Sequence, residues 1–203
     1  MIRVGITGVP GAGKTSLARG LASACRRIDG LKRVELVSEY ARRYISKHGS
    51  INSMWEQYRI LEKQREWEDS VSNDKLDLLI SDSPIFLGFI YCLELPKNDS
   101  KAVMCMNDVF KAMIKLNNPE PRYEIIFHLP PLIPPVDDGI RKNEYFITDT
   151  RNIMDEKIKV TIRDIFPPII YREIVEIDLN KRVDSCLSEI KKLGYFEEKD
   201  NGL

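Results

Sequence analysis

The chain of 203 residues has few of the side chains that build metal centres or disulfide frameworks. Its two histidines and four cysteines are scattered, and no two cysteines stand in a CxxC arrangement. This spacing argues against a structural zinc site, because such sites gather their ligands in close pairs. Scattered cysteines favour reduced thiols, and we therefore expect a cytoplasmic location.

Long apolar stretches and net charge are also lacking. No apolar run is long enough to span a bilayer, and the beginning MIRVGITG does not look like a signal peptide, so we expect no membrane partner. The 31 Lys and Arg residues balance 31 Asp and Glu residues, which leaves no overall basic footprint for nucleic acid. The length and the 43% hydrophobic content predict one soluble globular domain over residues 1–203.

Short apolar runs alternate with helical patterns along the chain. Near-continuous apolar runs are typical of parallel strands that are covered on both faces. Their alternation with helices predicts an α/β fold around a five-stranded parallel sheet. The predicted strands are Ile2–Val9, Val34–Tyr40, Leu76–Ser81, Tyr123–Leu129 and Glu173–Asp178.

The stretch GVPGAGKT, from Gly8 to Thr15, satisfies the phosphate-binding pattern G-x-x-x-x-G-K-[ST] between a predicted strand and a predicted helix. Glycines let backbone N–H groups approach a phosphate, and the start of the helix adds the positive end of its dipole. Lys14 is placed to reach the β- and γ-phosphates of ATP, and the Thr15 hydroxyl to ligate Mg²⁺. The predicted nucleotide-binding residues are Gly8, Pro10, Gly11, Ala12, Gly13, Lys14, Thr15 and Ser16.

Two carboxylates end predicted strands, where ligands of an open parallel sheet bind. Asp82 ends LDLLISD and is predicted to hold Mg²⁺, with a helix N-cap as the alternative role. Glu39 follows VELVS and has the chemistry to accept the proton of a substrate hydroxyl, or to form an ion pair with Arg42 or Arg43. Which of the two carboxylates is the base stays open at this stage.

Further candidates for the acceptor side lie on predicted helices. Arg42 and Arg43 directly follow Glu39, and Gln64 and Arg65 lie in the long helical pattern that ends near residue 71. The same helical pattern contains two tryptophans, which have the shape to hold a flat base but are more often part of a core.

A proline-rich connection, PPLIPPVDDGIRKNEYF, occupies residues 130–146. Its prolines disfavour regular structure until about Thr148, and a connection this long in a compact domain is usually a lid or a disordered loop. We therefore predict a lid at about residues 131–155 that delivers Arg141 or Arg151 to the phosphates and excludes water. The alternative for either arginine is a solvated charged loop.

Several segments together resemble the ribosylnicotinamide kinase domain of the NadR type, a P-loop small-molecule kinase related to deoxynucleoside and thymidylate kinases. The segments are SEYARRYI at residues 38–45, the Gln64-Arg65 pair, LLISDSP at 78–84, VDDGIR at 136–141 and IVEID at 174–178. The resemblance covers nearly the whole chain. It implies a three-layer sandwich of the P-loop type with a lid, ATP and Mg²⁺, and transfer of a γ-phosphoryl group to a nucleoside-type hydroxyl.

By position, the resemblance places Glu39 and Arg42 toward the acceptor, Asp82 at Mg²⁺ or the hydroxyl, and Arg141 in the lid. Lys14, Glu39, Asp82 and Arg141 are thus the predicted catalytic residues. Since the P-loop begins at Gly8, we expect a stand-alone kinase domain without the adenylyltransferase domain of bifunctional family members.

Three functions stay open on the sequence alone. The first is a kinase for a nucleoside- or nucleotide-like acceptor, such as nicotinamide riboside or a deoxynucleotide. The second is a kinase for a hydroxyl in DNA, such as a 5-hydroxymethylpyrimidine in phage-type DNA modification, and the third is a regulatory ATPase. The oligomeric state, including a homodimer, also stays open. A groove for DNA would use Arg42, Arg43, Lys47, His48, Arg59, Lys63 and Arg65.

Overall fold

The computed structural model describes residues 1–73, 75–94, 100–116, 121–135 and 147–194. Five strands form one parallel sheet in the order β2-β3-β1-β4-β5. This finding confirms the predicted sheet. The strands are β1 (Ile2–Gly8), β2 (Val34–Val37), β3 (Leu78–Asp82), β4 (Ile125–Leu129) and β5 (Ile170–Glu173).

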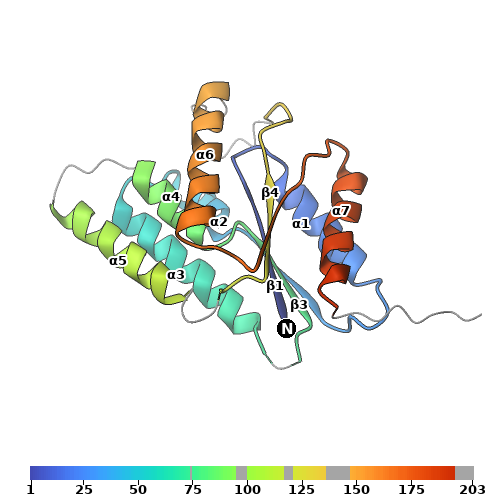
Figure 1. Cartoon of the computed structure of the whole chain (residues 1–203). Coiled ribbons are helices and arrows are strands. Elements are labelled where there is room, and N and C mark those ends of the chain that lie inside the picture. Colours follow the sequence, from blue (N-terminus) through green and yellow to red (C-terminus); the bar gives the residue numbers. More distant parts are fainter. Residues whose placement is uncertain (74, 95–99, 117–120, 136–146, 195–203) are drawn as a thin grey trace, which may run out of the picture.

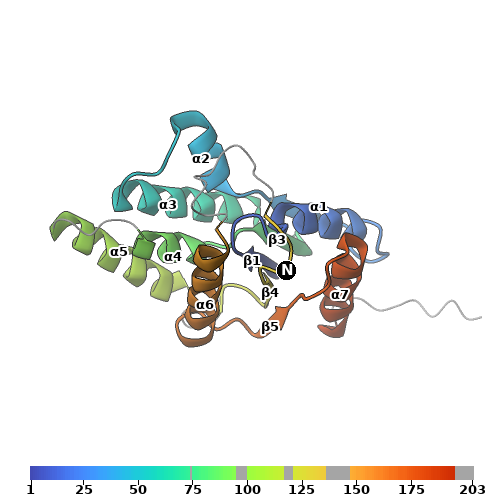
Figure 2. The same cartoon turned by 90° about the horizontal axis from the view of Figure 1, so that it is seen from above.

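Helices cover both faces of the sheet and complete three layers, as predicted (Figures 1 and 2). Helix α1 (Lys14–Cys25) packs beside α7 (Leu179–Lys192) on one face. The other helices lie on the opposite side, where α3 packs against α4 and α5, and α4 against α6. They are α2 (Tyr40–His48), α3 (Met54–Val71), α4 (Phe86–Glu94), α5 (Ser100–Leu116) and α6 (Thr148–Asp164).

Strand β1 occupies the middle of the sheet. Strands β3 and β2 lie on one side of it, and β4 and β5 lie on the other side, so the chain changes direction across the sheet at β1. Its apolar side chains are fully buried in the core between the two helical layers. The carboxyl end of β1 leads directly into the glycine-rich loop and α1 at the upper edge in Figure 1. In open α/β sheets, ligands bind at this kind of switch point, outside the carboxyl ends of the strands.

The position of the fifth strand corrects the prediction. The sequence predicts Glu173–Asp178, whereas β5 covers Ile170–Glu173 and pairs with β4 in that register. Val175 is 58% exposed and Ile177 is 70% exposed, so the apolar pattern of IVEID does not mark a core strand. The strand ends where its pairing with β4 ends, and that limit depends on tertiary contacts.

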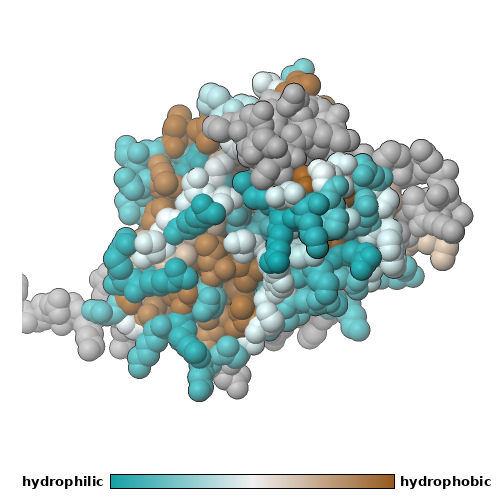
Figure 3. All heavy atoms as spheres, turned by 180° about the vertical axis from the view of Figure 1, so that it is seen from behind, coloured by the Kyte–Doolittle hydropathy of each residue, from teal (hydrophilic) through white to brown (hydrophobic). Residues whose placement is uncertain are grey.

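Seen from behind, the molecule presents a mixed surface (Figure 3). A hydrophobic area lies near the middle of this face, with hydrophilic side chains on both sides of it. In the described parts of the chain, no helix is both long enough and apolar enough to cross a membrane.

A buried polar network joins α3 to the strands beneath it. The Glu68 carboxylate is fully buried and accepts hydrogen bonds from Ser81 Oγ at 2.6 Å and from the Tyr123 hydroxyl at 3.0 Å. Arg122 donates to the same carboxylate at 3.1 Å. The Tyr123 oxygen in turn accepts from the backbone N–H of Ile85 at 3.1 Å, just after the end of β3. The network therefore holds the strand end that carries Asp82.

Replacing Glu68 with alanine is expected to lower the free energy of unfolding by about 3–5 kcal/mol, because it removes the buried partner of Arg122 and leaves the Ser81 and Tyr123 hydroxyls without their acceptor. Chemical denaturation of the purified protein would measure this loss. Glu66→Ala on the same helix is the matched control, since Glu66 pairs with Lys63 at the exposed surface, and it should cost less than about 1 kcal/mol. Equal losses in the two variants would contradict the structural role of the network.

Candidate active site

The loop after β1 needs glycine at several positions. Gly8, Gly11 and Gly13 have φ angles of 142°, 73° and 93°, a range that other residues rarely adopt. A Cβ atom on Gly8 would also lie 2.4 Å from the Leu129 carbonyl oxygen on β4. The backbone can therefore turn tightly here only with glycine, which explains the residue types of the phosphate-binding pattern.

Lys14 and Thr15 begin α1 at the end of this loop. The Lys14 side chain is buried, and its Nζ donates to the carbonyl oxygens of Gly8 at 2.9 Å and Val9 at 3.0 Å. The Thr15 hydroxyl donates to Asp82 Oδ2 at 2.7 Å. The loop and the end of β3 thus meet, although the two segments are far apart in the sequence.

The environment of Asp82 suits a hard cation. The residue is only 2% exposed, and its Oδ1 accepts no hydrogen bond from any residue that the structure describes. Burial, followed by the negative charge of Glu39, raises the pKa of Asp82, and the hydrogen bond from Thr15 opposes this rise. Magnesium prefers carboxylate and hydroxyl oxygens, so the pair of Asp82 and Thr15 fits Mg²⁺.

Glu39 does not lie on a strand as predicted. Strand β2 ends at Val37, and Glu39 occupies the N-cap position of α2. Its carboxylate is buried and lies 3.9 Å from the Arg42 Nε atom, so the ion pair considered from the sequence is present. Because its charge also acts on Asp82, the two carboxylates share one electrostatic environment.

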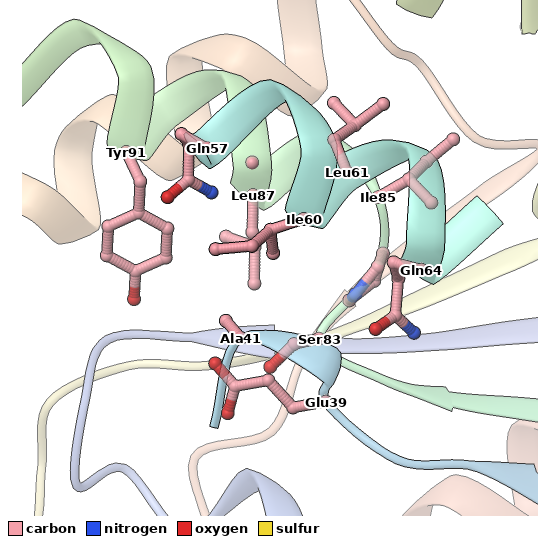
Figure 4. A pocket seen from close by; sticks show the side chains of 12 residues that line it. Glu39, Ala41, Gln57, Ile60, Leu61, Gln64, Ser83, Ile85, Leu87 and Tyr91 are labelled. Carbon is pink, nitrogen blue, oxygen red and sulfur yellow. The ribbon is translucent and has the colours of Figure 1, made fainter. Parts of the chain in front are cut away.

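A pocket open to solvent lies between α2, α3 and α4, with Glu39 at one side (Figure 4). Gln57 and Gln64 project into it from α3, and Tyr91 from α4. The pocket is lined by Glu39, Ala41, Gln57, Ile60, Leu61, Gln64, Ser83, Pro84, Ile85, Leu87, Gly88 and Tyr91.

Gln64 is the predicted acceptor residue with the clearest place in the pocket. Its Oε1 accepts a hydrogen bond from the Tyr40 backbone N–H at 2.8 Å, which orients the amide. Its Nε2 is buried and donates to none of the described residues. Gln57 was missed, but it precedes Gln64 by seven residues and helical periodicity puts both on one face. The helix thus offers the pocket two buried amides.

Ser83 connects the pocket to Asp82 and was also missed by sequence reasoning. It has a φ of 72°, the only positive value among the described residues other than glycine. Its hydroxyl is buried and has no hydrogen-bond partner in the described parts of the chain. Such strained residues often cluster at functional sites. The Ser83-Pro84 dipeptide was a turn signal, but no local pattern predicted its place in a pocket.

Other predicted acceptor residues lie elsewhere. Arg43 stacks over the Trp67 ring, 5.5 Å from its centroid. Arg65 does not line the pocket, and its charge acts on Tyr58. Trp55 is 59% exposed, which contradicts the expectation of a core tryptophan, whereas Trp67 packs against a small buried cluster.

Only part of the predicted lid lies within the described residues. The segment 136–146, with Arg141, is outside them. Helix α6 begins at Thr148, as expected from the end of the proline-rich stretch, and Arg151 in its first turn is buried. Arg151 Nη1 donates to the Ile133 carbonyl at 3.1 Å, whereas Nε and Nη2 have no partner among the described residues.

The central parallel sheet, the glycine loop and the Lys14–Thr15–Asp82 cluster define the chain as a P-loop protein with the fold of the P-loop kinases. A family model described as AAA domain matches residues 3–173, and the chain belongs to that family. No curated protein matches the sequence.

Solved structures share this fold at low sequence identity. NadR protein in complex with NR has a TM-score of 0.74 and 18% identity over 100% of this chain, which spans 54% of the NadR chain. Deoxyadenosine kinase from M. mycoides with bound dATP has a TM-score of 0.63 and 16% identity, covering 94% of this chain and 100% of its own. Thymidylate kinase from Candida albicans has a TM-score of 0.61 and 15% identity, covering 97% and 93%. The resemblance to NadR-type P-loop kinases is thereby confirmed at the level of the fold.

Proposed function

We propose that the protein is a kinase that transfers the γ-phosphoryl group of ATP to a hydroxyl of a nucleoside- or nucleotide-like small molecule. One observation carries this proposal: the phosphate cradle and the side-chain pocket adjoin at two buried carboxylates, Asp82 and Glu39. A phosphoryl donor in the cradle and an acceptor in the pocket would therefore meet at this point. The known structures with the same fold, which include a deoxyadenosine kinase and a thymidylate kinase, support this assignment.

The loop and its neighbours supply the donor side of the proposed reaction. Backbone N–H groups of the glycine loop would bind the phosphates, and Lys14 would exchange its two carbonyl partners for phosphate oxygens. Thr15 and Asp82 would hold Mg²⁺, which supplies charge neutralisation on the phosphates when it is bound. Arg151 presents N–H groups from the start of α6 and would add positive charge.

The acceptor side would use the pocket. The hydroxyl oxygen of the acceptor forms a bond to the γ-phosphorus, and the bond from that phosphorus to the β,γ-bridging oxygen breaks. ADP leaves with the electron pair of that bond. Glu39 lines the pocket, whereas Asp82 accepts a hydrogen bond from Thr15. We therefore infer that the Glu39 carboxylate accepts the proton of the acceptor hydroxyl. This division gives each carboxylate one role.

The lining of the pocket supports a flat polar acceptor. The amides of Gln57 and Gln64 offer both donors and acceptors, and apolar side chains from α3 and α4 surround them. Aliphatic walls with a few oriented polar groups are typical of sites for nucleoside-sized ligands. The structure of NadR in complex with NR and the deoxyadenosine kinase structure with dATP are consistent with this class.

Three of the seven basic residues suggested for a DNA groove make contacts within the protein. Arg42 lies against Glu39, Arg43 stacks on Trp67, and Lys63 pairs with Glu66. These contacts argue against a continuous basic surface for DNA phosphates, and we do not propose DNA as the acceptor.

The test is transfer of labelled γ-phosphate from ATP with Mg²⁺ to a panel of acceptors. The panel contains nicotinamide riboside, nucleosides, deoxynucleoside monophosphates, and duplex DNA with and without 5-hydroxymethylpyrimidines. We expect label in one small-molecule product. Label in DNA alone would replace the proposal with a DNA kinase, and release of free phosphate without any labelled acceptor would indicate a regulatory ATPase.

Replacing Glu39 with glutamine is expected to lower kcat by about 10²–10⁴-fold, the usual contribution of a general base. The affinity for ATP should change by less than about threefold, because the residue faces the pocket rather than the cradle. Steady-state kinetics and calorimetric titration with ATP would measure the two effects. The control is Glu35→Gln, at an exposed position of β2. A collapse of ATP affinity with turnover intact at saturation would show that the assignment is wrong.

A further inference from the structure

Arg182 lies outside every motif recognised in the sequence, yet it contacts the phosphate cradle. It belongs to the first turns of α7 and is only 3% exposed. Its Nη1 donates to the Ala12 carbonyl at 3.0 Å, and its Nε donates to the Glu176 carbonyl at 2.6 Å. The guanidinium therefore joins the glycine loop to the connection between β5 and α7.

The fit between Arg182 and the loop depends on a glycine. A Cβ atom at Gly13 would lie 3.0 Å from Arg182 Nη1 and 3.7 Å from Ile133 Cδ1. Gly13 directly precedes Lys14 and is the N-cap of α1. The guanidinium is thus packed against the residue whose backbone begins the phosphate-binding helix, on the side of the cradle away from the acceptor pocket.

The charge of this guanidinium is poorly compensated within the described residues. Its two hydrogen-bond acceptors are neutral carbonyl oxygens, and no carboxylate there forms an ion pair with it. Its Nη2 is buried and donates to none of the described residues. Burial lowers the pKa of Arg182, although the charge of Glu176 partly opposes this effect. A buried cation with a spare N–H group beside a phosphate-binding loop is suited to a polyanion.

We propose that Arg182 is a nucleotide-binding residue whose Nη2 donates to the phosphate chain in the cradle, while Nη1 and Nε hold the loop against α7. The inference rests on the proposed function, because it takes a nucleoside triphosphate as the ligand. It adds a phosphate contact from α7, which packs with α1 on the face of the sheet opposite to α3 and α4. The Arg182 side chain would then both bind the phosphates and hold the glycine loop in place.

The test is calorimetric titration of the full chain with ATP and with inorganic tripolyphosphate, in the presence of Mg²⁺ and at several salt concentrations. Arg182→Met keeps most of the side-chain volume and removes the charge. We expect its affinity for both ligands to fall at least tenfold. We also expect the slope of log Kd against log salt concentration to fall by about one, as for the loss of one phosphate contact.

Two further variants separate charge from loop shape. Arg182→Lys keeps the charge and should keep the wild-type salt slope, even if its affinity falls. Arg26→Met is the matched control, because Arg26 also donates two hydrogen bonds to a carbonyl oxygen, that of Val34, but lies at the other end of α1. It should bind ATP like the wild type.

The outcomes distinguish this inference from the proposed function. Weaker binding by Arg182→Met with an unchanged salt slope would overturn the phosphate contact and leave only a loop-holding role. Unchanged affinity would overturn both roles of Arg182 while the wild type still binds and transfers phosphate. Absence of ATP and tripolyphosphate binding by the wild type would overturn the inference together with the proposed function.

Discussion

Lys14→Ala is expected to lower kcat for phosphoryl transfer by about 10³-fold, because one preorganised positive group at the site of developing charge contributes about that factor. In the structure, Lys14 Nζ is held by the carbonyl oxygens of Gly8 and Val9 inside the loop. The side chain is therefore already positioned where the phosphates would bind. A labelled-ATP transfer assay, with the acceptor identified from the panel, would measure the loss.

The fold of the Lys14→Ala variant should remain intact, because removal of the Lys14 side chain leaves the sheet and both helical layers unchanged. Far-UV circular dichroism and thermal unfolding would check this. Lys32→Ala, at an exposed position before β2, is the control and should keep wild-type kcat. Substantial turnover by a well-folded Lys14→Ala protein would count against the assignment of the phosphate cradle.

Asp82→Asn is expected to change stability and activity in opposite directions. The pKa of Asp82 is raised by burial and by the charge of Glu39. The folded protein therefore keeps a proton on this carboxyl at pH values where the unfolded chain has lost it. Stability then falls as the pH rises from the ordinary Asp pKa, about 3.9, through the raised folded pKa. At pH values above this range, the requirement to bury the Asp82 carboxyl lowers the stability of the nucleotide-free protein.

Asparagine removes this charge and can still accept the hydrogen bond from Thr15. We therefore expect the variant without nucleotide to unfold at a higher temperature than the wild type at pH 7, with a flatter dependence of stability on acid pH. Its kcat should fall by about 10²-fold or more, because the proposed Mg²⁺ ligand is weakened. Calorimetric melting between pH 4 and pH 8 and Mg²⁺ titration of the transfer rate would measure the two effects.

Asp29→Asn, at an exposed position after α1, is the control and should change neither quantity. A lower melting temperature for Asp82→Asn at pH 7 would show that the carboxylate stabilises the nucleotide-free protein. If the transfer rate of Asp82→Asn depends on Mg²⁺ concentration as in the wild type, Asp82 is not a ligand of the metal.

The sequence by itself determined the cradle and the class of fold. The phosphate-binding loop is continuous in the chain, so the spacing from Gly8 to Thr15 was sufficient to predict it. The first four strands were found because buried parallel strands have nearly uninterrupted apolar runs. Asp82 followed from the same rule, since the end of such a strand lies at the ligand-binding edge.

Only the tertiary structure decided the pocket and the contacts across the loop. The fifth strand was misplaced because its ends depend on pairing with β4, and the contact of the Arg43 guanidinium with the Trp67 ring was visible only in the structure. Arg182 reaches Ala12 from 170 residues away in the sequence. Sequence periodicity reports the conformation of a local segment, whereas the meeting of distant side chains is set by the strand order and by how the helices pack on the sheet.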